Sequence, residues 1–210
     1  MEIILASCSE RRQYICSKIF KEYKTKASNA IEILSKNKNP NQALKISLIN
    51  AQKKSDSVAR NTPNHSLIIG CDTVIVSQKA ILGKPSDANE AIEMLSDLSD
   101  NTHSAITYVN IIETCDFKII KKLVFCDVTK ITFNLLDKST IIEYVAKFKP
   151  LDKAGAYGIQ EIPNNFIKEI HGSFWNVVGF PVEKFFLLAD NSWHKYFKKP
   201  HYDFNTIDKA

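Results

Sequence analysis

The apolar run at residues 67–76 carries a single carboxylate, Asp72, and this combination constrains the fold more than any other feature of the chain. The run is rich in β-branched residues, which favours a strand. Its apolar neighbours indicate that Asp72 is at least partly buried, and a buried carboxylate needs a charged partner or a metal. Gly70 allows another group to approach the backbone closely, which supports burial. The alternatives are an edge strand with Asp72 facing water, or an aspartate bonded to a nearby turn.

Helices and strands alternate along the rest of the chain. Strands are predicted at residues 2–7, 22–27, 103–113, 118–134 and 166–170, and helices at 10–20, 40–59, 86–98, 138–147 and 176–189. A turn at 77–79 should return the chain as a hairpin, and Ser86 and Asn176 are expected to cap the helices that follow them. The pattern predicts an α/β fold: a mixed, elongated, twisted sheet flanked by helices, with two lobes around a substrate groove.

The composition is that of an ordinary globular chain and argues against several functions. With 210 residues it forms one large domain or two small ones. The net charge of +5 comes from scattered lysines, so nucleic-acid binding is not expected, although an acidic ligand suits the balance. No apolar run has membrane-spanning length and no signal peptide is evident, so no membrane partner is expected. The five cysteines, with no Cys-x-x-Cys spacing, indicate free thiols in a reducing cytoplasm.

The paired arginines Arg11 and Arg12 stand in an unusual place. They follow a strand and a polar turn, in the first turn of a predicted helix, where the helix dipole disfavours cations. An external anion would relieve the conflict, because free backbone N–H groups, the helix dipole, a serine hydroxyl and a guanidinium would converge on it. The context therefore favours a phosphate or carboxylate site over two solvated charges.

Three further segments carry candidate ligand-binding groups. Lys84 follows the hairpin in a Gly-Lys-Pro turn that should aim it back toward Asp72. Lys54 lies near the end of the long predicted helix, where a lysine is favoured in any case. Gln160 ends a glycine-containing loop and offers both a donor and an acceptor, which suits recognition of a base edge.

Together these groups comprise one acidic centre, several cations, a helix N-terminus and a glutamine. This inventory suits phosphoanhydride cleavage, in which charge neutralisation and metal-held geometry do most of the work. Acyl transfer fits poorly because no serine lies on a nucleophile elbow, and neither a Walker A motif nor a G-x-G-x-x-G motif is present.

Five motifs in this order resemble the Maf family of nucleoside triphosphate pyrophosphatases. Residues 5–12 are similar to its Leu-Ala-Ser-x-Ser-Pro-Arg-Arg signature, and 69–74 to its second motif. Residues 82–85 are its Leu-Gly-Lys-Pro, 152–160 its Asp-Lys-Ala-Gly-Ala-Tyr-Gly-Ile-Gln, and 176–181 its closing motif. The resemblance implies a Maf-like domain at 1–190, followed by a tail at 191–210 without an assigned role.

The resemblance also implies the site. Asp72 would be the catalytic acid that accepts a proton from water, a metal ligand, or both, and Glu32 would be a second metal ligand for Mg²⁺ or Mn²⁺. Ser9, Arg12, Lys54 and Lys84 match phosphate-binding positions. Arg12, Thr73 and Gln160 match positions that track substrate choice. A nucleoside triphosphate partner, a cytoplasmic location and a homodimer are compatible with the family.

The combination of Arg, Thr and Gln resembles the branch that acts on dTTP and UTP, releasing monophosphate and pyrophosphate and so clearing unwanted pyrimidine nucleotides from the pool. The alternatives are the branch that acts on methylated guanine nucleotides, and a nucleotide-binding regulator of cell division without turnover. The chain departs from the family pattern at Glu10, Lys149 and Glu161. Glu10 places an acid beside the expected phosphate site.

Overall fold

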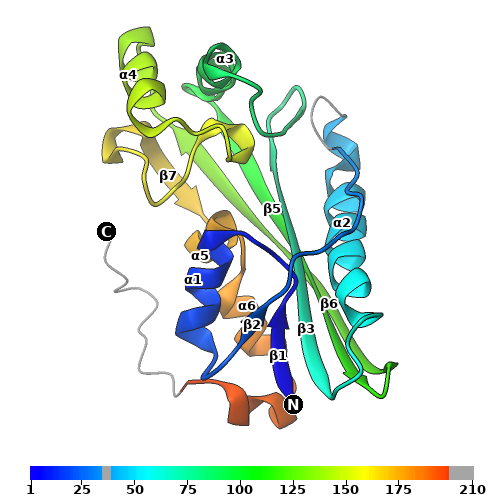
Figure 1. Ribbon diagram of the computed structural model, residues 1–210. Coiled ribbons are helices and arrows are strands. Elements are labelled where there is room, and N and C mark those ends of the chain that lie inside the picture. The colour runs from blue at the N-terminus through cyan, green and yellow to red at the C-terminus, as the bar shows by residue number, and fades with distance from the viewer. Residues whose placement is uncertain (35–38, 199–210) are drawn as a thin grey trace.

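The computed structural model, described for residues 1–34 and 39–198, is built around one seven-stranded mixed sheet (Figure 1). Its strands are β1 (Glu2–Leu5), β2 (Lys24–Thr25), β3 (Ser66–Val76), β4 (Ile81–Leu82), β5 (Thr102–Cys115), β6 (Lys118–Phe133) and β7 (Ile167–His171). Its α-helices are α1 (Glu10–Ile19), α2 (Ala43–Ala59), α3 (Ala88–Leu98), α4 (Lys138–Phe148), α5 (Phe174–Val178) and α6 (Val182–Leu188). Short 3-10 helices cover Pro40–Gln42, Ala154–Ala156, Asn164–Phe166 and Asn191–Tyr196.

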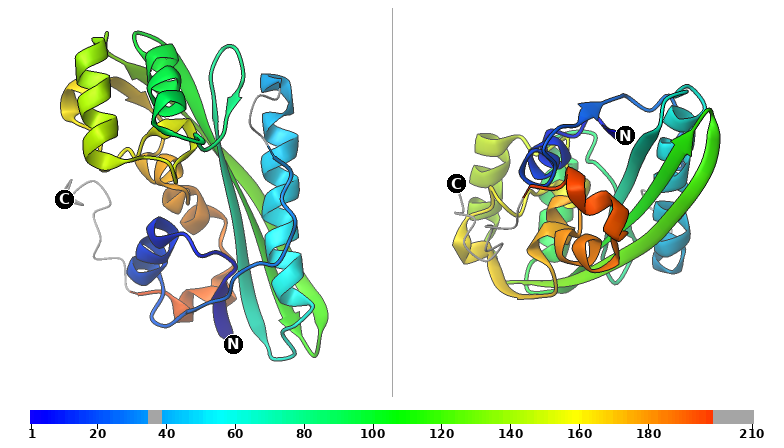
Figure 2. Two further views of the ribbon diagram at one scale, coloured as in Figure 1. Left: turned by 45° about the horizontal axis from the view of Figure 1, so that its top comes forward. Right: turned by 90° about the horizontal axis from the view of Figure 1, so that it is seen from below.

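The strand order β2-β1-β3-β5-β6-β7 places β3 inside the sheet, with the short β4 paired to its end. β1 runs parallel to β2 and β3, and the other pairs are antiparallel. Figures 1 and 2 show the long, twisted β5–β6 pair with α2 on one side and α1, α5 and α6 on the other, while α3 and α4 lie at one end. The predicted α/β fold with a mixed sheet flanked by helices is confirmed.

The parallel pairing of β1 with β3 positions the first turn of the chain. Leu5 is paired with Ile69, and the Ala6 amide donates to the Ile69 carbonyl at 2.8 Å. The chain then enters α1 at Glu10. Because Asp72 lies only a few residues further along β3, the sheet brings the N-terminus of α1 close to this carboxylate.

Gly70 on β3 allows helix α2 to pack directly against the sheet. A Cβ atom at Gly70 would lie 2.3 Å from the Ala51 carbonyl oxygen and 2.8 Å from the Ser55 amide nitrogen. Ala51 and Ser55 are themselves fully buried. The close approach that Gly70 predicts is therefore that of a helix backbone, and it brings the polar side chains of α2 next to β3.

The predicted helix at 176–189 is wrong as a single element, because α5 and α6 are separated by residues 179–181. Gly179 has φ 124°, a conformation that residues with a side chain rarely adopt, and it ends α5. Pro181 then precedes the first residue of α6 and removes a backbone donor. The break exposes the Gly179 carbonyl to a neighbouring side chain of α1.

Two predicted helix caps are also wrong. Ser173 caps α5, and its hydroxyl accepts from the Asn176 amide at 3.1 Å. Asp87 caps α3, whereas Ser86 donates from both its amide and its hydroxyl to the Glu90 carboxylate at 2.7 Å. In both helices the true cap lies three residues before its backbone donor, which is the usual capping geometry.

The first part of the C-terminal tail packs on the domain. Trp193 is 1% exposed, and its indole N–H donates to the Glu113 carboxylate at 2.9 Å. Phe197 packs edge-on against Phe20, with ring centroids 5.6 Å apart, at the end of α1. Residues 191–198 therefore complete the core beside α1, and residues 199–210 of the predicted tail lie outside the described residues.

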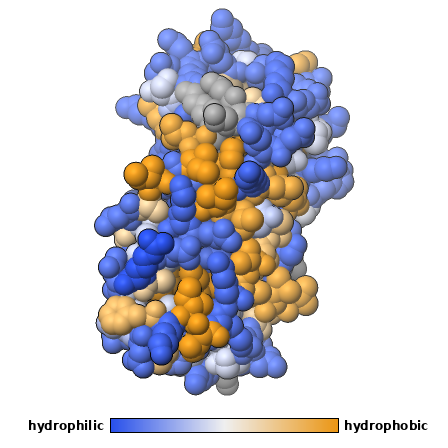
Figure 3. Space-filling view, turned by 90° about the vertical axis from the view of Figure 1, so that its right-hand side faces the viewer, coloured by the Kyte–Doolittle hydropathy of each residue, from blue (hydrophilic) through white to orange (hydrophobic). Residues whose placement is uncertain are grey.

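The side of the molecule that includes α2 carries exposed apolar side chains among polar ones (Figure 3). Ile31 is 87% exposed, Leu34 81% and Leu44 48%. Ile31 and Leu34 belong to the segment before α2, which forms neither helix nor strand from 26 to 34. Among the described residues no helix is both long and apolar enough to cross a membrane.

A buried histidine links β5 to the glycine-containing loop. His103 Nε2 lies 2.7 Å from the Tyr157 hydroxyl, and its ring packs edge-on against Phe133 and Tyr157. Its Nδ1 has no hydrogen-bond partner within the described part of the chain. Burial lowers the pKa of His103 from 6.5 to about 4, so the folded protein holds this ring neutral.

This depressed pKa predicts a loss of stability in mild acid. In the unfolded chain His103 becomes protonated below about pH 6.5, whereas in the folded protein it stays neutral down to about pH 4. The contribution of His103 to the free energy of unfolding is therefore fully present above pH 6.5 and decreases as the pH falls from 6.5 to about 4. We expect the free energy of unfolding to fall by roughly 2 kcal/mol from this residue between about pH 7.5 and about pH 5. Urea unfolding of the wild type and of His103→Gln at both pH values measures the difference, which should be smaller in the variant. Equal pH dependence in the two proteins would contradict the assignment.

Candidate functional site

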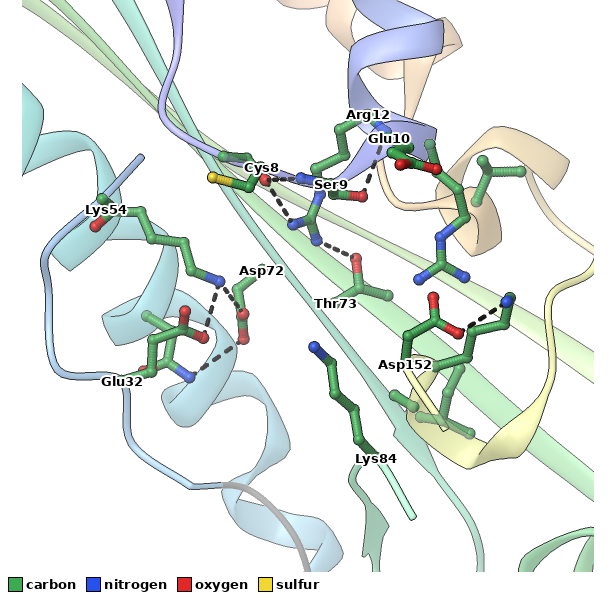
Figure 4. A pocket seen from close by; sticks show the side chains of 18 of the residues that line it. Cys8, Ser9, Glu10, Arg12, Glu32, Lys54, Asp72, Thr73, Lys84 and Asp152 are labelled. Atoms are coloured by element: carbon green, nitrogen blue, oxygen red, sulfur yellow. Dashed lines mark hydrogen bonds and ion pairs between the residues drawn. The ribbon is translucent and has the colours of Figure 1, made fainter. Parts of the chain in front are cut away.

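A cavity of about 1070 Å³ opens beside the middle of β3 (Figure 4). Six segments line it: the turn into α1, the loop before α2, α2 itself, β3 with its hairpin, the loop at 152–161, and α5. The structure places most of the predicted site residues in its wall: Ser9, Arg12, Glu32, Lys54, Asp72, Thr73 and Lys84. Groups from distant parts of the sequence therefore meet in one space.

Asp72 is the buried acid of this cavity. It is 8% exposed on the interior strand β3, so the predicted burial is confirmed and the edge-strand alternative is wrong. The Lys54 ammonium lies 2.7 Å from Asp72 Oδ1 and 3.0 Å from Glu32 Oε2. Burial raises the pKa of Asp72 above its ordinary value, and the Lys54 and Arg12 charges offset part of that increase. Asp72 is therefore a desolvated carboxyl group with one strong cationic partner.

Ser9 begins α1 at the rim of the cavity. Its hydroxyl accepts from the Arg12 amide at 3.5 Å, and the residue has the extended conformation of an N-cap. The predicted strand, turn and helix start at this position are confirmed. The free N–H groups of the first turn of α1 thus lie beside the cavity wall.

The Arg12 guanidinium is held by neutral oxygens. Its Nε donates to the Gly179 carbonyl and its Nη2 to the Thr73 hydroxyl, both at 3.0 Å, and its Nη1 lies 3.5 Å from the Ser7 hydroxyl. Within the described residues no carboxylate oxygen lies within 4 Å of this group. Arg12 is therefore fixed in position while its positive charge is left uncompensated at short range.

Arg11 lies in a different electrostatic environment. The carboxylates that act on it are Asp152 and Glu161 of the facing loop, and burial together with the Arg12 charge lowers the pKa of Arg11. Lys153 lies between the same two acids, 2.9 Å from Asp152 and 3.2 Å from Glu161. The unusual Glu161 thus takes part in a local network of charges, and the carboxylates of Asp152 and Glu161 both favour the charged form of Arg11.

Lys84 reaches the cavity from the hairpin, as predicted. β4 pairs with β3 through Leu82 and Ile75, which returns the chain to the carboxylate. Lys84 is exposed, and no carboxylate of the described residues lies within 4 Å of its ammonium. Figure 4 shows Lys84 and Arg12 directed into the same space from different sides.

Gln160 is the predicted site residue that the structure does not bring to the cavity wall. Gln160 is partly buried, and its side-chain oxygen is buried without a hydrogen-bond partner in the described residues. Its loop neighbours Tyr157 and Glu161 do line the cavity. The loop therefore presents other side chains to this space than its motif predicts.

The hydroxyl of Thr73 already donates its proton in a hydrogen bond inside the protein. It accepts from Arg12, which can only donate, and lies 2.9 Å from the Thr107 hydroxyl. Thr107 donates to the Asn176 carbonyl at 2.8 Å, so in the pair of threonines Thr73 must be the donor. The chain of bonds therefore runs in one direction, from Arg12 to Asn176, and Thr73 offers a ligand only an accepting oxygen.

Two buried residues of the site were missed from the sequence. Asn50 lines the cavity from α2 and is 3% exposed, and Thr107 is fully buried behind Thr73. For Asn50 a signal exists: it lies four residues before Lys54, on the same helix face as apolar residues of α2. For Thr107 the signal is only its alternation with apolar neighbours along β5, which does not distinguish it from other strand threonines.

Comparison with known proteins identifies the family. The model of the Maf family, described as Maf-like protein, matches residues 2–191. The chain belongs to the Maf family. The predicted resemblance is thereby confirmed, and the match covers the whole sheet, the cavity and every helix of the described chain except the last 3-10 turn.

Several curated proteins are similar to this chain over almost their full length. The dTTP/UTP pyrophosphatase of Clostridium novyi is 35% identical over 90% of this chain and 96% of its own. Those of Clostridium botulinum strain Okra and of a Geobacillus species are 38% and 39% identical, over 87% of this chain and 92% and 94% of theirs. A solved nucleoside-triphosphatase (dITP/XTP pyrophosphatase) of Mycobacterium abscessus aligns at 12% identity with a TM-score of 0.39, over 63% of this chain and 74% of its own, a likeness too distant to support an inference.

The one-way chain of bonds in this Maf domain predicts an unequal response to removing two buried threonine hydroxyls of β5. Thr107→Val leaves the Thr73 hydroxyl proton without its acceptor and removes one donor to the Asn176 carbonyl, which keeps the Gly179 amide as its other donor, and we expect a loss of about 1–3 kcal/mol in the free energy of unfolding. Thr114→Val is the control, because Thr114 is equally buried but makes only a 3.5 Å contact with the Ser66 carbonyl. Urea unfolding should show the larger loss in Thr107→Val, and equal losses would argue against the chain of bonds.

Proposed function

We propose that this Maf protein hydrolyses dTTP and UTP between the α- and β-phosphates, giving the nucleoside monophosphate and pyrophosphate. The observation that carries the proposal is that one cavity holds a buried acid, Asp72, together with two cations, Arg12 and Lys84. Within the described chain neither cation has a carboxylate oxygen within 4 Å. The names of the curated relatives support the substrate class. A cavity of about 1070 Å³ has room for a nucleotide.

The cations suit the charge of a triphosphate. Arg12 is held by neutral acceptors, so its remaining N–H donors can bind phosphate oxygens without breaking an ion pair. The first turn of α1, with the Ser9 hydroxyl, supplies further donors and a favourable dipole. Lys84 approaches from another side of the cavity. Together they would fix the phosphate chain and stabilise the charge that develops on it.

Asp72 is suited to accept a proton from the attacking water. Burial raises its pKa, which makes the carboxylate a stronger base than an exposed aspartate, and the Lys54 ammonium at 2.7 Å favours its ionised form. The same carboxylate could hold a metal, as the family resemblance implies. Both roles require the ionised form, and both are lost when the carboxylate becomes an amide.

A divalent cation, Mg²⁺ or Mn²⁺, is part of the proposal, and the residues fit it. The carboxylate oxygens of Glu32 and Asp72 already converge on one positive charge, the Lys54 ammonium. Hard cations such as Mg²⁺ prefer oxygen ligands and commonly take one or two carboxylates, with phosphate oxygens and water completing the shell. No group of three metal-binding side chains gathers among the described residues, which agrees with a shell shared with substrate. The bound metal would neutralise phosphate charge during the reaction.

The choice of pyrimidine nucleotides is supported by the relatives and by Thr73, which lines the cavity and holds Arg12. The side chain of Gln160 does not line the cavity. In this proposal Gln160 affects substrate choice indirectly, through the loop that also carries the cavity-lining Tyr157. We place the activity in the cytoplasm, as clearance of unwanted pyrimidine nucleotides. The five unpaired cysteines support that compartment.

The test is product analysis with a panel of canonical and modified triphosphates in the presence of Mg²⁺ or Mn²⁺. We expect dTTP and UTP to be the preferred substrates and to yield monophosphate and pyrophosphate. Asp72→Asn should lower kcat by about 10²-fold or more, because it removes the proton acceptor. Asp97→Asn, on the exposed face of α3, is the matched control and should retain activity. Release of orthophosphate, preference for methylated guanine nucleotides, or full activity of Asp72→Asn would overturn the proposal.

A further inference from the structure

Asn50 is a buried amide that touches both acid-bearing segments of the site. It lies on the face of α2 that packs against the sheet, 3% exposed and four residues before Lys54. Burying an amide without hydrogen-bond partners destabilises the folded protein, so a buried asparagine is normally bonded to specific neighbours. Two of them reach the segment that carries Glu32, and a third reaches Asp72.

The bonds to the first segment clamp its backbone. The Ile33 amide donates to Asn50 Oδ1 at 2.7 Å, and Asn50 Nδ2 donates to the Ile33 carbonyl at 3.0 Å. This pair fixes the orientation of the amide, because only an oxygen can accept from the backbone N–H. Glu32 is the residue immediately before Ile33, so the clamp determines where its side chain begins.

The segment needs such a clamp because it has no regular structure of its own. Residues 26–34 form neither helix nor strand, and Ile31 and Leu34 on either side of the clamp are largely exposed. Ile33 itself is partly buried and packs against a small apolar cluster. Lys54 binds the Glu32 side chain but not the backbone of this segment, and the 2.9 Å contact between Ser28 and Ser57 anchors the segment without touching either carboxylate.

The remaining N–H of the amide is directed at the acid on β3. Asn50 Nδ2 lies 3.4 Å from Asp72 Oδ2, the oxygen that Lys54 does not contact. The same side chain therefore sets the position of the backbone beside Glu32 and donates to the Asp72 carboxylate. Figure 4 shows Glu32 and Asp72 meeting at the Lys54 ammonium.

We propose that Asn50 is a positioning residue that pre-organises Glu32 and Asp72 as a pair of ligands for a divalent cation. This inference rests on the proposed function, since it concerns the cation of the same site. A residue that orients metal ligands through hydrogen bonds acts on metal affinity even though it does not touch the metal, and its loss commonly costs 10- to 100-fold in that affinity. Without Asn50 the Glu32 segment would have to be ordered at the moment of binding.

The test is the affinity of the nucleotide-free protein for Mn²⁺, measured by calorimetry or electron paramagnetic resonance in a double-mutant cycle. Asn50→Leu, of similar size, should weaken binding about tenfold, and Glu32→Gln should also weaken it. The double variant should bind within about threefold of Glu32→Gln alone, because the clamp then positions a ligand that has been removed. Ser57→Ala, which releases another anchor of the same segment, should remain within about twofold of the wild type.

Wild-type affinity in a folded Asn50→Leu protein, or losses that multiply in the double variant, would overturn the proposal, as would a wild type that does not bind Mn²⁺. Circular dichroism establishes that each variant is folded, and Asn50→Ala replaces Asn50→Leu in the cycle where the larger side chain is not accommodated. Because no nucleotide is present, a wild type that fails to release pyrophosphate would count against the proposed function and leave the cycle interpretable.

Discussion

A desolvated carboxylate on an interior strand is the constraint on which the arrangement of the site depends. Asp72 cannot remain charged at 8% exposure without compensation from nearby groups. That compensation comes from Lys54 and Asn50, both on α2, and α2 can lie close enough only because Gly70 has no side chain. The position of the helix, the small residues in its contact with β3 and the polar side chains on its buried face thus follow from one charge.

The second organising feature is the different surroundings of two neighbouring arginines, Arg11 and Arg12. Cations in the first turn of α1 oppose the helix dipole, and the sequence predicts that Arg12 binds an external anion while Arg11 raises the local potential or pairs with Glu10. The structure divides them. Arg11 faces the carboxylates of Asp152 and Glu161, whereas Arg12 is bound by a carbonyl and by hydroxyl groups. Neutral acceptors hold a guanidinium in position without cancelling its charge. Arg12 is therefore the arginine that can bind an anion without first breaking an ion pair.

Local patterns predicted much of this fold because they report local physics. The β-branched run around Asp72, the strand–turn–helix before Arg12 and the hairpin before Lys84 are each formed within a few residues of sequence, and each is confirmed. Features that depend on tertiary contacts could not be read from local patterns. The side-chain oxygen of Gln160 is buried and the residue does not line the cavity, and the clamp made by Asn50 requires a backbone seventeen residues away. The break at Gly179 is different, since the glycine and the following proline were visible in the sequence.

The two partners of Asp72 on α2 differ in a way that matters for a cation site. Lys54, Glu32 and Asp72 together carry one net negative charge when all are ionised, and the ammonium occupies the space between the carboxylates. A divalent cation there would neutralise both acids and would compete with Lys54 for the same oxygens, leaving the ammonium free to face a phosphate. Asn50 has no such competition, because its bonds to Ile33 are made to the backbone and do not depend on which cation is present. In the proposed cation site Asn50 would therefore keep the geometry of the two acids, while Lys54 would give up its place between them to the cation.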